Sequence, residues 1–303
     1  MMLPLLSKSS ASYSLSSVGS VTACKALYSS VSPDSKKLDL AFFKTDLKDK
    51  GEPSDRPILI LHGLLGSKQN WRSLSKKFGR ALQREVYSID LRNHGESPHA
   101  DPHTYEAMVE DVINFYDQHK IESAVLIGHS MGGRVAMGTS LLRPELVRGL
   151  VSVDMAPNLN NAETNADRYL DGLEEIQNSL VSSLREADTI LSKYEKSLPI
   201  RQFVMTNLVY TEDKKAVKPK IAVQILKKYF YDLGSWPFDP QLQYKGPSIL
   251  VGGNHSSYFS DLAKLSFKKT FPNSNIVGLD TVHSEDPEGF FQVVSEFIKD
   301  SKI

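Results

Sequence analysis

One motif narrows the possible folds of this chain more than any other: a serine flanked by glycines directly after an apolar run. Residues 128–132 read G-H-S-M-G and are centred on Ser130; residues 124–127 are apolar, and a helix-like stretch follows. A G-x-S-x-G pattern between a strand and a helix is typical of a nucleophile elbow, a sharp turn that lifts the hydroxyl clear of the sheet. The glycines are needed because larger side chains would collide where strand and helix meet. We predict that Ser130 is a nucleophile; the alternative is a glycine-rich strand end.

Short apolar runs alternate with helix-like segments along most of the chain. Strands are predicted at residues 38–43, 57–61, 86–89, 124–127, 150–153, 248–251 and 276–279. Helices are predicted at residues 71–82 and 104–119, and in the second of these the apolar residues recur at helical spacing. Short, fully apolar strands separated by helices indicate a parallel sheet that is covered on both faces.

Between residues 157 and 236 the strand pattern disappears. Amphipathic, helix-like segments replace it at residues 168–180, 183–198, 200–208 and 220–231. Numbered as in a sheet of eight strands, residues 150–153 are the sixth strand and residues 248–251 the seventh. We interpret this region as a helical cap inserted after the sixth strand of the fold. Met205, Tyr210, Phe230 and Trp236 either line a substrate cleft or pack the interior of the cap.

Charge and cysteine content restrict the function. The chain has 36 Lys and Arg against 36 Asp and Glu, so it lacks the basic surface expected of a nucleic-acid-binding protein, and we exclude DNA and RNA as main partners. Cys24 is the only cysteine, which excludes an intramolecular disulfide and a cysteine-based zinc site. No apolar stretch reaches the roughly 18 residues of a membrane-spanning helix, so we predict no transmembrane segment.

The N-terminal segment has the composition of a targeting peptide. Residues 1–32 are rich in serine and contain Lys8 and Lys25, and no acidic residue precedes Asp34. We predict a mitochondrial transit peptide at residues 1–32 and hence a mitochondrial location. The segment lacks arginine, so the alternative is a tail that carries no targeting signal. Residues 1–6 are too short and too interrupted by proline for the apolar region of a secretory signal.

A serine hydroxyl needs a base to remove its proton, and the base needs a carboxylate that fixes its tautomer. On this architecture the order along the chain is serine, acid, histidine. His283 lies just past the last predicted strand, where a loop can place its ring over the elbow. We predict that His283 is the base; the alternative is a helix-capping or surface histidine.

The acid is assigned to Asp154. The seventh strand runs into Asn254 and His255, neither of which is a carboxylate. Asp154 follows the sixth strand instead, which should lie beside the strand that bears the nucleophile, so its side chain can reach the same histidine. Asp261 is the alternative acid, and a turn cap is the non-catalytic alternative for Asp154.

An oxyanion hole needs two backbone N–H groups aimed at the developing negative charge. One is expected from Met131, the residue after the nucleophile, and the other from Leu64 in residues 62–66, which read H-G-L-L-G. We expect His62 to shape this loop without taking part in proton transfer. The charged segment 90–97, which contains His94, is interpreted as a structural loop.

Together these motifs resemble those of the α/β-hydrolase family, and more narrowly its mitochondrial branch with the abhydrolase-domain-eleven proteins and the yeast ethanol acetyltransferases. The resemblance runs from residue 38 to the C-terminus. It rests on residues 62–71 (HGLLGSKQNW), 90–95 (DLRNHG), 128–133 (GHSMGG) and 153–157 (VDMAP). It implies an α/β-hydrolase domain at residues 38–303, with a mostly parallel, eight-stranded sheet flanked by helices and an inserted helical cap at about residues 157–236. It also implies an acid after the sixth strand, which supports Asp154.

The activity that the resemblance implies is alcohol acetyltransferase. The enzyme would make ethyl acetate from acetyl-CoA and ethanol through an acyl-serine intermediate, with thioesterase and esterase side activities on other acyl esters. The alternative is a mitochondrial serine esterase or lipase of the abhydrolase-domain-eleven type, in which water replaces the alcohol. A non-catalytic protein that binds a partner or ligand is the alternative of another class, and the intact Ser130, Asp154 and His283 argue against it. Acetyl-CoA serves as a substrate, and no residue requires a metal or a bound cofactor.

Overall fold

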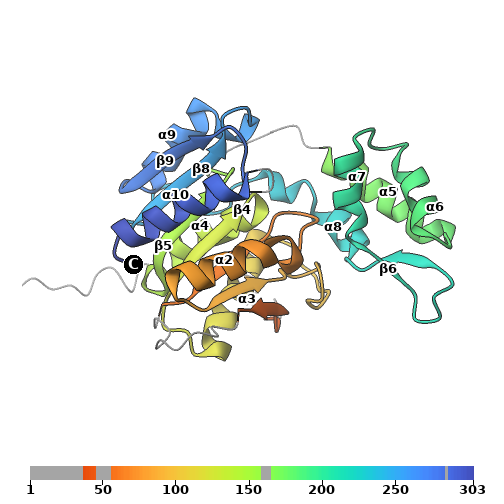
Figure 1. The fold of residues 1–303 in the computed structure, drawn as a ribbon, viewed down its shortest axis with the longest axis horizontal. Coiled ribbons are helices and arrows are strands. Elements are labelled where there is room, and N and C mark those ends of the chain that lie inside the picture. Colours follow the sequence, from red (N-terminus) through yellow and green to blue (C-terminus); the bar gives the residue numbers. More distant parts are fainter. Residues whose placement is uncertain (1–36, 46–55, 158–164, 284–285) are drawn as a thin grey trace, which may run out of the picture. The chain divides into compact units, whose positions relative to one another are not determined.

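The computed structural model describes residues 37–45, 56–157, 165–283 and 286–303. The predicted transit peptide, residues 1–32, lies outside the described residues. The centre is a seven-stranded sheet in the order β1-β3-β2-β4-β5-β8-β9 (Figure 1). Its strands are β1 (Phe42–Lys44), β2 (Ile58–Leu61), β3 (Val86–Ile89), β4 (Ala124–His129), β5 (Val147–Val153), β8 (Ser248–Gly253) and β9 (Ser274–Leu279). β1 is antiparallel to β3, and the other neighbouring pairs are parallel.

The mostly parallel sheet confirms the predicted fold class, with two differences in its strands. The described residues form seven strands in this sheet, whereas eight were expected. The predicted strand at residues 38–43 begins later, at Phe42. The reason is that the backbone N–H of Leu38 donates to Asp111 Oδ1 at 2.9 Å, so this part of the chain bonds to a helix side chain in place of the sheet.

Helices cover both faces of the sheet (Figure 1). On one face lie α2 (Arg72–Leu82), after the 3-10 turn η2 (Lys68–Trp71), and α10 (Pro287–Asp300); their apolar side chains share one buried cluster with β2, β4 and β5. On the other face lie α4 (Met131–Leu142) and α3 (Tyr105–His119), which pack together. α9 (Asp261–Thr270) packs against β9, and short 3-10 turns are η3 (Pro144–Leu146) and η5 (Ser257–Phe259).

α3 shows why the helices form where the sequence indicates them. The side chain of Thr104 accepts a hydrogen bond from the Ala107 N–H and so caps the first turn. Met108 and Val112 on its apolar stripe are completely buried, so the stripe packs in the core. Among the described residues, no helix combines the length and the apolar character needed to cross a membrane.

The segment between β5 and β8 is mostly helical. It contains α5 (Ala166–Ser179), α6 (Leu184–Leu191), α7 (Leu198–Met205), β6 (Leu208–Tyr210), β7 (Val217–Pro219), α8 (Val223–Tyr229) and η4 (Asp232–Gly234). The expectation that no strand lies here was wrong, because β6 and β7 form an antiparallel hairpin. Strands of three residues are too short for their alternation to be recognised. The turn between them is closed by the Thr211 hydroxyl, which donates to Asp213 Oδ1 and accepts from the Ala216 N–H.

Two of the aromatic and sulfur side chains singled out in this segment pack its interior. Met205 and Phe230 lie against a buried cluster built from α5, α6, α7 and α8. Tyr210 is 48% exposed, and the ring of Trp236 lies 4.9 Å from that of Phe238. For Met205 and Phe230 the structure therefore favours packing over a cleft-lining role.

Candidate active site

Ser130 lies at the turn between β4 and α4 and has the strained backbone expected of a nucleophile elbow. Its φ and ψ are 50° and −116°, a region that residues other than glycine rarely adopt and that costs on the order of 1–3 kcal/mol. Two hydrogen bonds hold it there: its N–H donates to Val153 O at 3.0 Å, and its carbonyl accepts from the Arg134 N–H at 3.2 Å.

The flanking glycines are required by the close approach of backbone segments. A Cβ at Gly128 would lie 2.2 Å from the carbonyl oxygen of Gly132. A Cβ at Gly132 would lie 2.5 Å from the carbonyl oxygens of both Leu61 and His62. Because these contacts are with backbone atoms, no side chain can move aside to make room.

The two predicted oxyanion donors lie on either side of the elbow. Leu64 is in a tight turn closed by the Gly66 N–H and the Gly63 carbonyl at 2.9 Å, and Met131 is the first residue of α4. A Cβ at Gly63 would lie 3.3 Å from Ser130 Cβ, so the turn touches the nucleophile. Within the described parts of the chain, neither the Leu64 nor the Met131 N–H has a protein acceptor. Two unpaired donors beside one hydroxyl are suited to stabilise an oxyanion, and their assignment stays a prediction.

Asp154 lies at the same edge of the sheet as Ser130. It follows β5, which pairs with β4 so that Val153 is opposite His129. Its Oδ2 accepts a hydrogen bond from Ser256 Oγ at 2.7 Å, and its Oδ1 accepts from the Gly253 N–H at 3.3 Å. Burial raises the pKa of the Asp154 carboxyl, and the two hydrogen bonds oppose that shift.

Ser256 was missed by the sequence analysis. It lies in the loop after β8, where a carboxylate was sought and only Asn254 and His255 were noted. A hydroxyl in this loop can support an acid supplied by the neighbouring strand, because the carboxyl ends of parallel strands meet at one edge of the sheet. That placement is the signal that could have drawn attention to Ser256.

His283 is held beside the elbow by aromatic contacts. Its ring stacks on Trp71 with centroids 4.3 Å apart and an interplanar angle of 2°, and it lies 4.5 Å from the ring of His129, the residue before Ser130. Burial, and secondarily His129, hold the pKa of His283 well below its ordinary value. Its Nδ1 is buried without a hydrogen-bond partner. In the described residues no hydrogen bond joins His283 to Ser130 or to Asp154, so the structure does not connect the three predicted catalytic residues.

The alternative acid, Asp261, is exposed to solvent, whereas Asp90 and Arg92 of the charged loop are buried. Asp261 begins α9 with a side chain that is 96% exposed, 3.4 Å from Lys264 Nζ.

In the charged loop, Asp90 is completely buried and accepts from the Lys68 N–H at 2.6 Å. Arg92 is buried against Asp111 at 2.6 Å. These contacts agree with a structural role for the charged loop.

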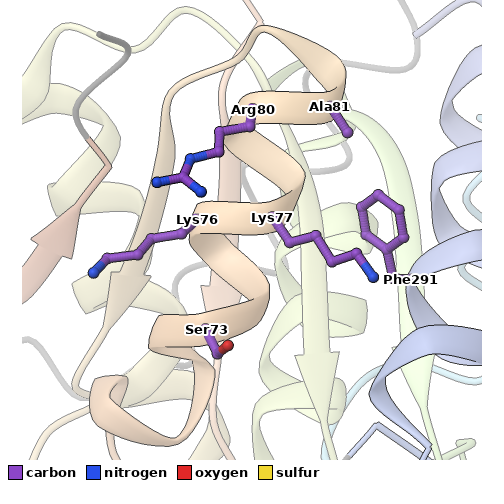
Figure 2. Close-up of a pocket in the computed structure, with 6 residues that line it drawn as sticks. All are labelled: Ser73, Lys76, Lys77, Arg80, Ala81 and Phe291. Atoms are coloured by element: carbon purple, nitrogen blue, oxygen red, sulfur yellow. The ribbon is translucent and has the colours of Figure 1, made fainter.

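A surface pocket lies along α2. It is lined by Ser73, Lys76, Lys77, Arg80 and Ala81 of α2 and by Phe291 of α10. Figure 2 shows Lys76 and Arg80 extending to one side of α2, while Lys77 points toward Phe291. Lys77 Nζ lies 4.3 Å from the centre of the Phe291 ring and pairs with Glu288. No predicted site residue lines this pocket.

Comparison with known proteins gives consistent matches over most of the chain. A family model described as the alpha/beta hydrolase fold matches residues 56–285. The chain is 35% identical over 258 residues to sn-1-specific diacylglycerol lipase ABHD11 of Danio rerio, covering 82% of this chain and 80% of the relative. It is 32% identical over 271 residues to the "Probable alcohol acetyltransferase" of Saccharomyces cerevisiae, covering 83% of this chain and 79% of the relative. A solved structure titled "Marine microorganism esterase" superposes with a TM-score of 0.77 at 32% identity, covering 86% of this chain and 99% of that one.

Proposed function

Because this chain belongs to the α/β-hydrolase family, we propose that it is an enzyme that transfers acyl groups through an acyl-Ser130 intermediate. The observation that carries the proposal is the strained elbow at Ser130, which is followed directly by the unpaired N–H of Met131 and is approached by the turn that carries the unpaired N–H of Leu64. A non-catalytic binding protein has no need of this strained arrangement.

The residues of the site have complementary tasks in this chemistry. Ser130 Oγ attacks the acyl carbonyl while His283 takes its proton, and the Leu64 and Met131 N–H groups stabilise the tetrahedral oxyanion. The thiol or alcohol leaves with the proton from His283, which then activates the second nucleophile. The lowered pKa of His283 keeps the ring neutral at pH 7 and thus able to act as a base.

Asp154 supports the imidazolium that forms on His283. For this its carboxylate has to accept the Nδ1–H of His283, the ring atom that is buried without a partner. The Ser256 hydroxyl and the Gly253 N–H hold the carboxylate in place. The catalytic step therefore requires the His283 ring and the Asp154 carboxylate to come within hydrogen-bond distance of each other.

For the acyl donor and acceptor we propose acetyl-CoA and ethanol, with ethyl acetate as the product. The similarity to the yeast protein named as a probable alcohol acetyltransferase supports this choice. Water competes with ethanol for the same acyl-enzyme, which accounts for thioesterase and esterase side activities. The second candidate is an esterase acting on acylglycerols, supported by the similarity to the diacylglycerol lipase of Danio rerio.

The test of the proposed function supplies purified protein with acetyl-CoA, with and without ethanol, and measures ethyl acetate, acetate and free thiol. We expect thiol release in both cases and ethyl acetate only with ethanol, with Ser130→Ala as the inactive control. Thiol release without ester would contradict the transferase and leave the hydrolase, which diacylglycerol hydrolysis then tests. Absence of turnover and of labelling by a fluorophosphonate would contradict catalysis altogether.

Replacing Ser256 with alanine is expected to lower turnover about tenfold and to move the acid limb of kcat/KM to higher pH. The Ser256 hydrogen bond lowers the pKa of Asp154, so its loss raises that pKa and Asp154 becomes protonated earlier as the pH falls. A hydrogen bond to a charged group is worth about 1.5–3 kcal/mol, of which about 1.4 kcal/mol corresponds to a tenfold change.

The pH profile of ester hydrolysis measures this effect. Ser257→Ala is the matched control, since Ser257 is the exposed neighbour of Ser256. A Ser256→Ala profile identical to that of the wild type would show that Ser256 does not act on Asp154.

The proposal also covers the location of the protein, its binding partners and its cofactors. The composition of residues 1–32 supports a mitochondrial location. Small acyl esters, short alcohols and water are the proposed binding partners, and the balanced charge of the chain argues against nucleic acid. The proposed chemistry uses acetyl-CoA as a substrate and requires neither a metal nor a resident cofactor.

A further inference from the structure

Two buried histidines tie the turn that carries Leu64 to the neighbouring charged loop. His62 Nε2 accepts a hydrogen bond from the Leu91 N–H at 3.0 Å, and His94 Nε2 accepts from the Leu65 N–H at 3.1 Å. Both side chains are almost completely buried, and their rings lie 5.1 Å apart. Each loop thus contributes one histidine that holds the backbone of the other.

The second ring nitrogen of each histidine determines its tautomer. His62 Nδ1 lies 2.8 Å from Gly63 O, and His94 Nδ1 lies 3.0 Å from Arg92 O. Because a carbonyl oxygen only accepts, Nδ1 carries the proton and the Nε2 lone pair faces the backbone N–H. Burial lowers the pKa of both histidines, which keeps the rings neutral as this pattern requires.

The peptide unit between Gly63 and Leu64 is oriented by His62. Its carbonyl oxygen accepts from His62 Nδ1 and also from the Gly66 N–H at 2.9 Å. In a trans peptide the N–H points opposite to the C=O. Fixing the Gly63 carbonyl therefore fixes the direction of the Leu64 N–H, the donor that has no acceptor in the described residues.

The backbone N–H and carbonyl groups of Leu65 are held by His94 and by Asn207, a residue of the helical segment between β5 and β8. Leu65 has a φ of 60°, a conformation that needs support in a residue other than glycine. Its N–H is held by His94, and its carbonyl oxygen accepts from Asn207 Nδ2 at 2.8 Å. Asn207 lies between α7 and β6 and is 1% exposed. The helical segment between β5 and β8 thereby contacts the Leu64 turn directly.

We propose that His62, His94 and Asn207 are positioning residues that aim the Leu64 N–H at the oxyanion. This inference rests on the proposed function. The three side chains, called the loop brace below, do not touch the substrate and act through the backbone of residues 63–65. Through Asn207, the helical segment between β5 and β8 takes part in setting the oxyanion geometry.

The test compares substitutions that keep or remove the acceptor of His94. His94→Gln retains an oxygen that can accept from the Leu65 N–H, whereas His94→Leu does not. His103→Leu is the matched control, because His103 is also completely buried and its ring lies 5.6 Å from that of His94, while its hydrogen bond is to Asn93 outside the turn. Asn207→Ala removes the hydrogen bond to the Leu65 carbonyl oxygen and so tests the contribution of the helical segment to the brace.

Each variant is assayed for ester hydrolysis per active site labelled by a fluorophosphonate, and for inhibition by a trifluoromethyl ketone that forms a tetrahedral adduct. We expect His94→Leu to lower kcat about 100-fold with little change in KM, because a misplaced donor loses transition-state stabilisation. Its affinity for the trifluoromethyl ketone should fall by a similar factor. His94→Gln should recover most of the loss, Asn207→Ala should lower kcat about tenfold, and His103→Leu should keep kcat per labelled site.

The outcomes separate the brace from the proposed function. Wild-type kcat per labelled site in both His94→Leu and Asn207→Ala would overturn the loop brace while leaving the enzyme intact. If His94→Leu does not fold, wild-type kcat per labelled site in Asn207→Ala would by itself overturn the loop brace. A wild-type protein that neither turns over esters nor is labelled would overturn the proposed function instead.

Discussion

Replacing Ser130 with alanine is expected to lower turnover by about a millionfold while the protein stays folded. The loss is large because the hydroxyl forms the acyl bond itself and no neighbouring group can take its place. Folding should be unaffected, since in the described residues the Ser130 side chain makes no hydrogen bond that alanine would remove, and the backbone bond to Val153 is kept.

Acyl-transfer rates and thermal unfolding of the variants measure the two parts of this expectation. Ser130→Gly should be equally inactive but more stable than Ser130→Ala, by on the order of 1 kcal/mol, because glycine adopts a φ of 50° without strain. Ser73→Ala on the exposed side of α2 is the control and should match the wild type (Figure 2). If Ser130→Ala kept more than about a hundredth of the wild-type rate, the acyl-serine mechanism would be excluded.

The free energy of unfolding is expected to fall by about 6 kcal/mol between pH 7 and pH 4. Burial lowers the pKa of His129 to about 4 and the pKa of His103 to about 3. An unfolded histidine has a pKa near 6.5, so the unfolded chain takes up protons first as the pH falls. The stabilisation is complete above pH 6.5 and is lost progressively below it, by about 3 kcal/mol per histidine at pH 4.

This loss is comparable to the whole stability of a typical domain, which is about 5–15 kcal/mol. The lowered pKa values of His62, His94 and His283 act in the same direction, so unfolding near pH 4 is expected. Urea unfolding at pH 7, 6, 5 and 4 measures the slope. His103→Leu should flatten it by about 3 kcal/mol. A stability that is constant from pH 7 to pH 4 would contradict this account.

The parts of the site that could be predicted are those whose atoms lie close together in the sequence. The elbow is an example: its strain and its glycine contacts arise within residues 128–133 and against the strand beside them. Likewise, α3 could be predicted because its cap and apolar stripe are contained in one segment. Ser256 was missed, because its role depends on Asp154, a residue 102 positions away.

Periodicity and motifs were thus sufficient for the α/β class, the mostly parallel sheet and the sharp strand-to-helix turn at Ser130. The tertiary structure alone decided the strand order, which places Asp154 and Ser256 at one edge, and the burial of His283 between Trp71 and His129. It also decided the contact between Asn207 and Leu65, which are 142 residues apart. The physical reason is that local patterns encode backbone conformation and apolar faces. Hydrogen bonds between distant loops exist only once packing has brought the loops together.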